Sequence, residues 1–328
     1  MLPLAQQSRA ALYIYEQTGY GVIPSTGAPA IRVPLVSWTL AKDQPLTASN
    51  VVNSTRNPTR PFAEAPKVGG GFVIQLDPIS AGFFTKWTFG TLTTTGPVST
   101  IYTHVGKINA AGVPWLTIEL VFFGVNVVWR AVNCKIGRQS FDVTPSGLLQ
   151  LTFDAMGSDI TRDVGGAPLD AAPFTPSSAV AFRAAAVSIA EAGVTFERAS
   201  RFAMSFDNAL EAVPTLFNGG VPYDIIEGIG RPTGTLTVLL ANAAIHDKGD
   251  AGTESSLLST FAATDGVSSI AYDFREIIYG AATPPASGGT GPVPTDFAWQ
   301  AYLDDDAGGS AAIVTVKNTL ASHAAIPA

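Results

Sequence analysis

Short runs of alternating apolar and polar residues, or of clustered β-branched residues, recur along the whole chain. A period of two places every second side chain on one face, which is typical of half-buried β-strands. Glycine, proline and asparagine separate the runs and mark turns. Strands are therefore predicted at Ala11–Tyr15, Val33–Leu40, Gly71–Leu76, Leu116–Phe123, Val127–Val132, Gln139–Val143, Leu148–Phe153, Val180–Ile189, Val194–Phe206, Thr233–Leu240, Ser268–Phe274, Phe297–Leu303 and Ala312–Val316.

Helical periodicity is scarce in this chain. One short helix is predicted at Pro78–Phe89, because Asp77 is a favourable N-cap and proline suits the first helical turn. A second is predicted at Thr253–Ala262, opening near Glu254. Each follows a predicted glycine-led strand, so the pattern indicates one helix at a similar place in each half of the chain.

The second half of the chain echoes the first at an offset of 163–164 residues in a chain of 328. The glycine-led strands belong to this echo, with Glu64 seven residues before Gly71 and Glu227 seven residues before Gly234. Two further echoes occur in the same order and pair longer segments, namely Ser37–Leu46 with Arg201–Leu210 and Phe141–Phe153 with Tyr302–Val316.

Collinear echoes predict an internal duplication. We expect a mainly β fold of two tandem β-sandwich or barrel modules, each with a short helix. The first module spans residues 1–170 with an N-terminal arm, and the second spans residues 171–328. Segments 157–178 and 280–295 are rich in glycine, proline and alanine, and they are predicted to be flexible loops.

Composition favours a protein that assembles. Hydrophobic residues make up 46% of the chain and charged residues only 14%, well below the usual quarter. No run approaches the 18 apolar residues of a membrane span. Because monomers rarely expose large apolar patches, burial against other chains is the favoured explanation, with an unusually apolar monomer as the alternative.

The net charge of −7 argues against ordinary nucleic-acid binding, since the 19 basic residues are scattered rather than clustered. An acidic surface repels DNA, which suits a conduit through which DNA slides. Cys134 is the only cysteine, so no disulfide forms within the chain.

The chemistry-bearing residues do not form a recognisable active site. The three histidines, His104, His246 and His323, lack metal-ligand spacing. The glycines of Gly228–Gly234 precede a strand, whereas a phosphate-binding loop precedes a helix. Asp304–Asp306 lacks the twelfth-position glutamate of a calcium loop, because that position is Thr315. No catalytic, cofactor-binding or metal-binding residue is predicted, and the chain is not expected to be an enzyme.

Five segments carry a resemblance to a known family. In order along the chain, they are Lys67–Pro78, Gly82–Gly90, Pro114–Glu119, Asn133–Phe141 and Phe202–Glu211. Through them the chain resembles the tail tube proteins of long-tailed, siphovirus-type bacteriophages, in the family of roughly 300-residue members. The resemblance lies in the order of the segments and in their general residue pattern rather than in a diagnostic motif.

The resemblance implies modules of two packed antiparallel sheets flanked by a helix. One sheet joins those of neighbouring subunits into a closed β-barrel that lines a channel, and the rings stack into a filament. Typical members are single-module hexamers, so a two-module chain is expected to form a homotrimeric, pseudo-hexameric ring. The Met1–Arg32 arm and the 280–295 loop are expected to mediate ring stacking.

The implied role is to enclose a tape-measure protein during assembly and to conduct DNA during ejection. An acidic lumen repels the phosphate backbone, and the candidate lumen carboxylates are Asp142, Asp154, Asp304, Asp305 and Asp306. The implied partners are the chain itself, the tape-measure protein, the tail terminator and the distal tail or baseplate proteins. DNA passes without specific binding, and no cofactor or membrane is involved. The implied location is the virion, with assembly in the host cytoplasm.

Two alternatives stay open. One is another β-rich phage virion component, such as a tail terminator, a baseplate hub or a capsid decoration protein. The other is a two-domain β-sandwich carbohydrate-binding protein or enzyme, which predicts exposed aromatics or a carboxylate pair on one module only. The five tryptophans mostly sit inside apolar strands, which favours a core role for them.

Overall fold

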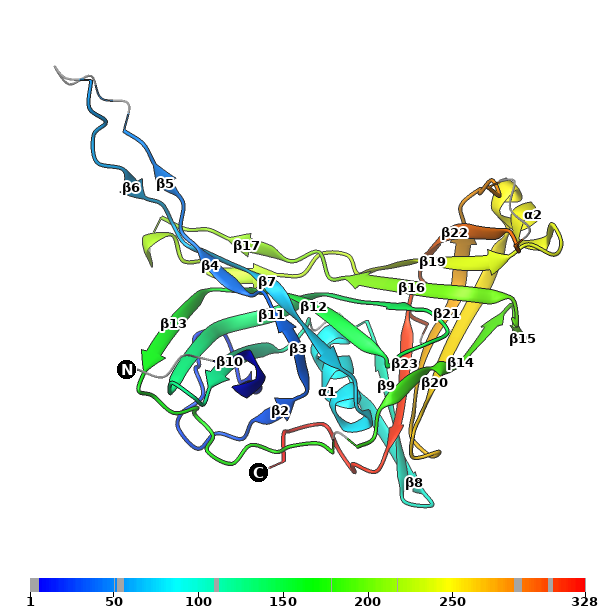
Figure 1. Ribbon diagram of the computed structural model, residues 1–328, viewed down its shortest axis with the longest axis horizontal. Helices are drawn as coiled ribbons and strands as arrows, with labels where there is room; N and C mark the ends of the chain where they lie inside the picture. Colours follow the sequence, from blue (N-terminus) through cyan, green and yellow to red (C-terminus); the bar gives the residue numbers. More distant parts are fainter. Residues whose placement is uncertain are drawn as a thin grey trace.

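The computed structural model describes residues 6–49, 51, 56–108, 112–177, 179–216, 218–285, 291–305 and 309–327 (Figure 1). These residues form a mainly β fold with two α-helices, which confirms the predicted fold class. Among them, no helix combines the length and apolar character needed to cross a membrane.

A continuous antiparallel sheet runs through both halves of the chain. Its strands follow one another in the spatial order β3/β4–β7–β12–β11–β16–β19–β22. Their bounds are β3 (Leu35–Trp38), β4 (Ala41–Asp43), β7 (Lys67–Gln75), β12 (Gln150–Gly157), β11 (Val127–Val143), β16 (Ala199–Asp207), β19 (Arg231–Leu239) and β22 (Pro294–Ala301).

Each half adds outer strands that cover one face of this sheet. In the first half they are β1 (Ala10–Gln17), β2 (Ile31–Val33), β10 (Trp115–Phe122) and β13 (Asp159–Val164), together with the beginning of β11. In the second half they are β14 (Phe182–Glu191), β15 (Val194–Thr195), β20 (Glu254–Ala263), β21 (Ser269–Tyr279) and β23 (Ile313–Asn318).

The remaining elements are hairpins and short helical turns. Two small hairpins leave the continuous sheet, and a third hairpin follows the first α-helix. Their bounds are β5 (Leu46–Thr47) with β6 (Phe62–Ala63), β17 (Glu211–Val213) with β18 (Asp224–Ile226), and β8 (Thr93–Val98) with β9 (Ile101–Lys107). The single 3₁₀ turns are Gln7–Arg9 and Asn218–Gly220.

Helix α1 (Pro78–Phe89) has the predicted bounds and the predicted cap. The Asp77 carboxylate accepts hydrogen bonds from the backbone N–H groups of Ile79 and Ser80, both at 2.9 Å. The helix ends at Gly90, whose φ of 84° is a left-handed conformation that favours glycine. Ten of its twelve residues are buried, so α1 belongs to the core.

The second predicted helix is wrong. Residues 254–263 form strand β20, and the helix of the second half is α2 (Ala244–Ala251). The error has a physical reason, because Leu257 and Phe261 lie four residues apart and therefore share a face in a helix and in a strand alike. In the structure every second residue of β20 is buried, which is the strand period.

The pairing register confirms the duplication residue by residue. Adding 164 to both partners of Trp38↔Phe72 gives Phe202↔Leu236, and both pairs are present. The same offset converts Asp43↔Lys67 into Asp207↔Arg231, and Thr47↔Phe62 into Glu211↔Ile226. The strand before each hairpin, the hairpin itself and the strand after it are thus equivalent in the two halves.

The third echo is misaligned. The sequence comparison paired Phe141–Phe153 with Tyr302–Val316, but the structural counterpart of β12 is β22, since Phe153 faces Phe72 as Phe297 faces Leu236. The counterpart of β11 is β21. Strand β23 pairs with the first part of β21 as β13 pairs with the first part of β11. Hairpins of similar texture recur in β proteins, and only the pairing partners distinguish them.

The two halves interlock. Strand β9 of the first half pairs from Tyr102 to Lys107 with β23 of the second half, and α1 packs against β23. One hydrophobic core includes side chains of both halves, such as Phe84, Phe206 and Val314. The boundary between modules 1–170 and 171–328 stays a prediction, because the structure shows a shared core rather than two separate ones.

The linker between the halves is more ordered than expected. Residues 159–164 of the predicted loop 157–178 form strand β13. After β13, the Leu169 N–H donates to the Glu119 carboxylate at 3.2 Å, and Asp170 accepts from the Ala30 N–H at 3.0 Å. These contacts hold the linker against β10 and against the residue that precedes β2. In the other predicted loop, 280–295, residues 286–290 lie outside the described part of the chain.

Candidate assembly surfaces

One face of the continuous sheet packs on the core, and the other faces solvent with charges of both signs. From β4 to β22, the accessible acids on this face are Asp43, Asp142, Asp154, Asp207 and Asp296, and the accessible bases are Lys67, Arg138, Arg201 and Arg231. Acid stands opposite base in several pairs. Arg138 lies between Asp154 and Asp207 in the register. The face is therefore close to neutral rather than strongly acidic.

The structure does not gather the five predicted lumen carboxylates in one place. Asp142 and Asp154 lie on the solvent face of the continuous sheet. Asp304 is buried after β22, where the Arg275 Nη1 lies 3.1 Å from its carboxylate. Asp305 is exposed in the same loop, and Asp306 lies outside the described residues. The lumen-facing role of all five stays a prediction.

Asp142 is paired with a base from the other half of the chain. Arg201 donates to both of its carboxylate oxygens, at 2.8 and 2.5 Å, across the junction of β11 and β16. These hydrogen bonds hold the pKa of Asp142 below its usual range. Both side chains are about half exposed, so the pair orients the two strands more than it stabilises them.

The two ends of the continuous sheet differ from its middle. In the middle, β16 pairs on both sides, with β11 of the first half and β19 of the second. Its counterparts β3 and β4 pair, among the described residues, on one side only, with β7. At the opposite end, β21 leaves the sheet after Tyr279, whereas its counterpart β11 continues along β16 as far as Val143. Unpaired strand edges are surfaces on which another chain can add strands.

The β17–β18 hairpin of the second half docks on the first half. The Lys135 Nζ donates to the Ile225 carbonyl and to the Glu227 carboxylate, both at 2.7 Å. The same ammonium lies 4.1 Å from the centre of the Trp115 ring, a cation–π contact. Ile225 is fully buried by this docking.

Glu227 is held in its ionised form at this contact. Burial disfavours its charge, but hydrogen bonds from Lys135 and from the Val113 N–H outweigh burial and lower its pKa. Glu64 is not its counterpart as the sequence comparison assumed, since an offset of 164 places Glu227 over Ala63. The two glutamates therefore have different partners, and Glu64 accepts a hydrogen bond from Thr47 of its own hairpin.

The β5–β6 hairpin of the first half projects away from the rest of the molecule (Figure 1). It has the same register as β17–β18 but exposes its apolar side chains, with Leu46 68% and Phe62 65% exposed. Exposed large apolar side chains on a projecting element indicate a surface that another chain covers.

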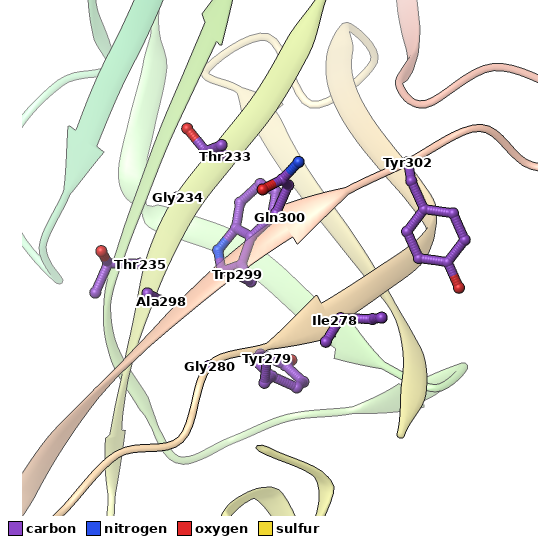
Figure 2. A pocket seen from close by; sticks show the side chains of 10 residues that line it. All are labelled: Thr233, Gly234, Thr235, Ile278, Tyr279, Gly280, Ala298, Trp299, Gln300 and Tyr302. Atoms are coloured by element: carbon purple, nitrogen blue, oxygen red, sulfur yellow. The ribbon is translucent and has the colours of Figure 1, made fainter. Parts of the chain in front are cut away.

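An open pocket of about 760 Å³ lies where β21 leaves the sheet (Figure 2). Ile278, Gly280, Ala298 and Gln300 are among the residues that line it. Tyr302 stands at one side of the pocket and donates a hydrogen bond to Glu254, which raises the tyrosine pKa to about 12.

The rim of this pocket is acidic. Beside Tyr302, Glu276 lies close enough to Glu254, Asp304 and Asp305 to interact with their charges. Partial burial, together with these neighbouring carboxylates, raises the pKa of Glu276. Within the described residues, no group of three or more His, Cys, Asp or Glu side chains is arranged to hold a metal ion.

Sequence reasoning missed Lys135, Trp115 and Ile278, the residues that organise these surfaces. Lys135 is a single lysine in a β-rich run, and the residues around it do not indicate that a distant hairpin covers it. The available signal was the duplication, which places Lys135 and Ile278 at equivalent positions, facing Met156 and Gln300. The geometry as a whole is suited to association between modules.

Among known proteins, a solved structure and a family model are similar to this chain. No curated protein matches the chain. A solved structure, the cryo-EM structure of the anti-feeding prophage (AFP) baseplate, 6-fold symmetrised, contains a similar chain at 11% identity. The match covers 50% of this chain and 99% of that one, with a TM-score of 0.33. The model of the phage tail tube protein family matches residues 7–301, nearly the whole length. The chain therefore belongs to the phage tail tube protein family.

Proposed function

We propose that this chain polymerises into stacked rings that form the tube of a phage tail, with three chains in each ring. The observation that carries the proposal is the β11–β16 junction. There the continuous sheet passes from the first module to the second, because β11 and β16 pair at six positions, from Arg138↔Asp207 to Val143↔Phe202. The outer ends of the same sheet lack such a partner among the described residues.

Repeating this junction between chains closes the sheet. The strand equivalent to β16 is β3/β4, and the segment equivalent to the end of β11 is the one that follows Tyr279. Pairing β3/β4 of one chain with that segment of the next continues the internal junction as far as Thr283, beyond which Pro284 and Pro285 have no N–H to donate. Closure removes both open edges. Because tail tube rings are built of six modules in the family that the chain resembles, two modules per chain give three chains.

The solvent face of the continuous sheet is proposed to line the channel. Its acids and bases nearly balance: Arg138 and Arg231 face aspartates in the register, and Arg201 bonds Asp142. Paired bases are poorly available for the phosphate backbone. DNA would therefore slide past without specific binding, which is a weaker condition than a strongly acidic lumen.

The proposed role is structural and not enzymatic. The tube would enclose a tape-measure protein during assembly, contact a tail terminator and the distal tail or baseplate proteins at its ends, and conduct DNA during ejection. The Met1–Arg32 arm, expected from the sequence to mediate ring stacking, contains the buried strand β1, so most of that strand is unavailable for stacking. Ring stacking is assigned to the part of the 280–295 loop beyond the segment that pairs with β3/β4. The tube would assemble in the host cytoplasm as part of a siphovirus-type virion.

Electron microscopy of the purified chain tests the proposal. We expect long hollow tubes, and native mass spectrometry of the dissociated rings is expected to give three times the mass of the 328-residue chain. Six chains per ring would contradict the trimer while leaving the tube intact. Monomers or discrete rings that never stack would favour the other β-rich virion components instead.

A further inference from the structure

The pocket at the end of β21 corresponds to a site that is filled in the first module. Ile136 faces Ala155 as Tyr279 faces Trp299, so the residues that follow, Gly137 and Gly280, are equivalent. A methyl group added to Gly137 would lie 3.7 Å from the Asp154 carbonyl, and one added to Gly280 would lie 3.6 Å from the carbonyl of the equivalent residue, Ala298. The two glycines thus have the same backbone surroundings.

What differs is the side chain above them. At Gly137 the Leu210 side chain lies 3.2 Å from the added methyl position, whereas at Gly280 Ala298 is the only described residue whose side chain lies within 4 Å. Leu210 stands at the base of the β17–β18 hairpin. Its equivalent at the base of β5–β6, by the offset of 164, is Leu46, which is largely exposed.

We propose that the β5–β6 hairpin of one chain docks on the second module of the next chain, with Leu46 seated over Gly280 in the pocket lined by Ile278 and Gln300. The docking reproduces between chains the contact that β17–β18 makes within a chain. It rests on the proposed ring, because only a closed ring of equivalent modules presents each projecting hairpin to a neighbouring pocket.

The charges of the two contacts are complementary with opposite signs. The segment 208–230, which contains β17–β18, carries three acids and no base, and it docks beside Lys135. The segment 44–66, which contains β5–β6, carries Arg56 and Arg60 against a single acid, and the proposed pocket has the acidic rim of Glu254 and Glu276. The sign reversal disfavours binding of the wrong hairpin at either site, because like charges then meet.

The main chain supports the same arrangement. The Asn208 N–H donates to the Gly137 carbonyl at 2.7 Å, and the Asn208 side-chain amide donates to the Ile136 carbonyl at 3.0 Å. The equivalent residue at the base of β5–β6 is Gln44, which also carries a side-chain amide. Docking places Gln44 where it can donate to the carbonyls of Gly280 and Tyr279 in the next chain.

Disulfide trapping tests the docking. In a chain carrying Leu46→Cys and Gly280→Cys, oxidation of the assembled protein is expected to link neighbouring chains, and non-reducing electrophoresis is expected to show a covalent closed oligomer in place of the monomer. The native Cys134 is fully buried and does not compete. Each single-cysteine variant is expected to migrate as a monomer in the same non-reducing electrophoresis.

The chain supplies matched controls. Leu210→Cys with Gly137→Cys is the internal copy of the pair, and it is expected to form a disulfide within one chain without linking one chain to another. Leu46→Cys with Val267→Cys places the second thiol at the opposite end of β21, and it is expected to give no cross-link.

The outcomes separate this docking from the proposed tube. If the wild-type chain forms three-chain rings and the internal pair cross-links, but Leu46→Cys with Gly280→Cys does not, the docking is wrong and the tube stands. If the cross-linked oligomer contains six chains, the docking stands and the trimer is wrong.

Discussion

The two hairpins that leave the continuous sheet have one register and two environments. The β17–β18 hairpin lies on the first module, where Ile225 is buried and Lys135 binds both its backbone and Glu227. The β5–β6 hairpin reaches into solvent with Leu46 and Phe62 exposed. Equivalent backbones therefore carry different side-chain surfaces, because the partner of one hairpin is in the same chain and the proposed partner of the other is not.

The strands before the hairpins show the same contrast. On β16, Phe206 is buried and stacks on Phe89 of α1, with ring centres 4.6 Å apart. Its counterpart on β4 is Lys42, which is exposed and pairs with Asp159. A position inside the junction of two modules needs an apolar residue, whereas the same position at an open sheet edge needs one that stays soluble until assembly.

Truncating Phe206 is the largest expected disturbance of this contrast. Phe206→Ala should lower the free energy of unfolding by about 3–5 kcal/mol, because it leaves a cavity between the modules. Lys42→Ala, the matched control, should change it by at most about 1 kcal/mol, since its ion pair is partly exposed. Urea unfolding of the unassembled chain measures both. Equal losses would show that the two strand positions are not distinguished by burial.

Acid is expected to weaken the contact between α1 and the segment that contains His323. His323 lies beneath α1 and donates to the Ile79 carbonyl, and burial together with the neighbouring His104 lowers its pKa to about 3. Burial also lowers the pKa of His104. Both rings are therefore neutral in the folded chain at pH values where they are protonated in the unfolded chain.

The direction of the pH dependence of stability follows from these protonation states. Above pH ~6.5 neither state binds these protons, and below it the unfolded state binds more, so stability falls as the pH falls toward 3. For His323 the slope is about 1.4 kcal/mol per pH unit between its unfolded-state and folded-state pKa values, and His104 acts in the same direction. His323→Gln should lose less stability than the wild type between pH 6.5 and 5, by about 2 kcal/mol. Parallel pH profiles of unfolding for the two proteins would contradict this assignment.

Removing Lys135 should release the docked hairpin without unfolding the rest. Lys135→Met deletes the hydrogen bonds to Ile225 and Glu227 and leaves a half-buried carboxylate without its cation. The expected loss is about 1–3 kcal/mol. Hydrogen exchange of residues 211–226 should accelerate toward the rate of residues 46–63. Ile278→Met, at the equivalent position of the second module, serves as the control and should leave both hairpins unchanged in the unassembled chain.

The exposed pair at the module junction is expected to contribute least. Arg201→Ala should lower stability by less than about 1 kcal/mol at neutral pH, because both partners are about half exposed. The lowered pKa of Asp142 means that this contribution is present above pH ~4 and is lost as the pH falls through the folded-state pKa. Urea unfolding at low and high salt measures this contribution. A loss of several kcal/mol would show that the ion pair, rather than packing, stabilises the module junction.

Much of the fold was predictable where the local signal and the tertiary fold agree. Asp77, Pro78 and Gly90 define α1 through cap chemistry that acts over a few residues. The first echo fixed the equivalence of β4 and β16, because the strand and the Asp that closes it recur at one offset. The helix predicted at Thr253–Ala262 failed where Leu257 and Phe261 satisfied two periods at once.

The assembly surfaces were less predictable, because they depend on partners distant in sequence. The acidic turn predicts Asp304 to be a lumen carboxylate, yet it lies buried beside Arg275, which no local pattern indicates. Lys135 contacts a hairpin about 90 residues further along the chain. Such pairs become visible only when the strands are placed.

The sequence by itself determined that the chain is mainly β and duplicated, because strand period, turn residues and repeated segments are local properties of the chain. Tertiary structure decided which hairpin is docked and which projects, and which end of the sheet stays open. Those features depend on long-range strand pairing such as β9 with β23 and β11 with β16. A module's neighbour, rather than its own residues, sets whether an equivalent surface is buried or exposed.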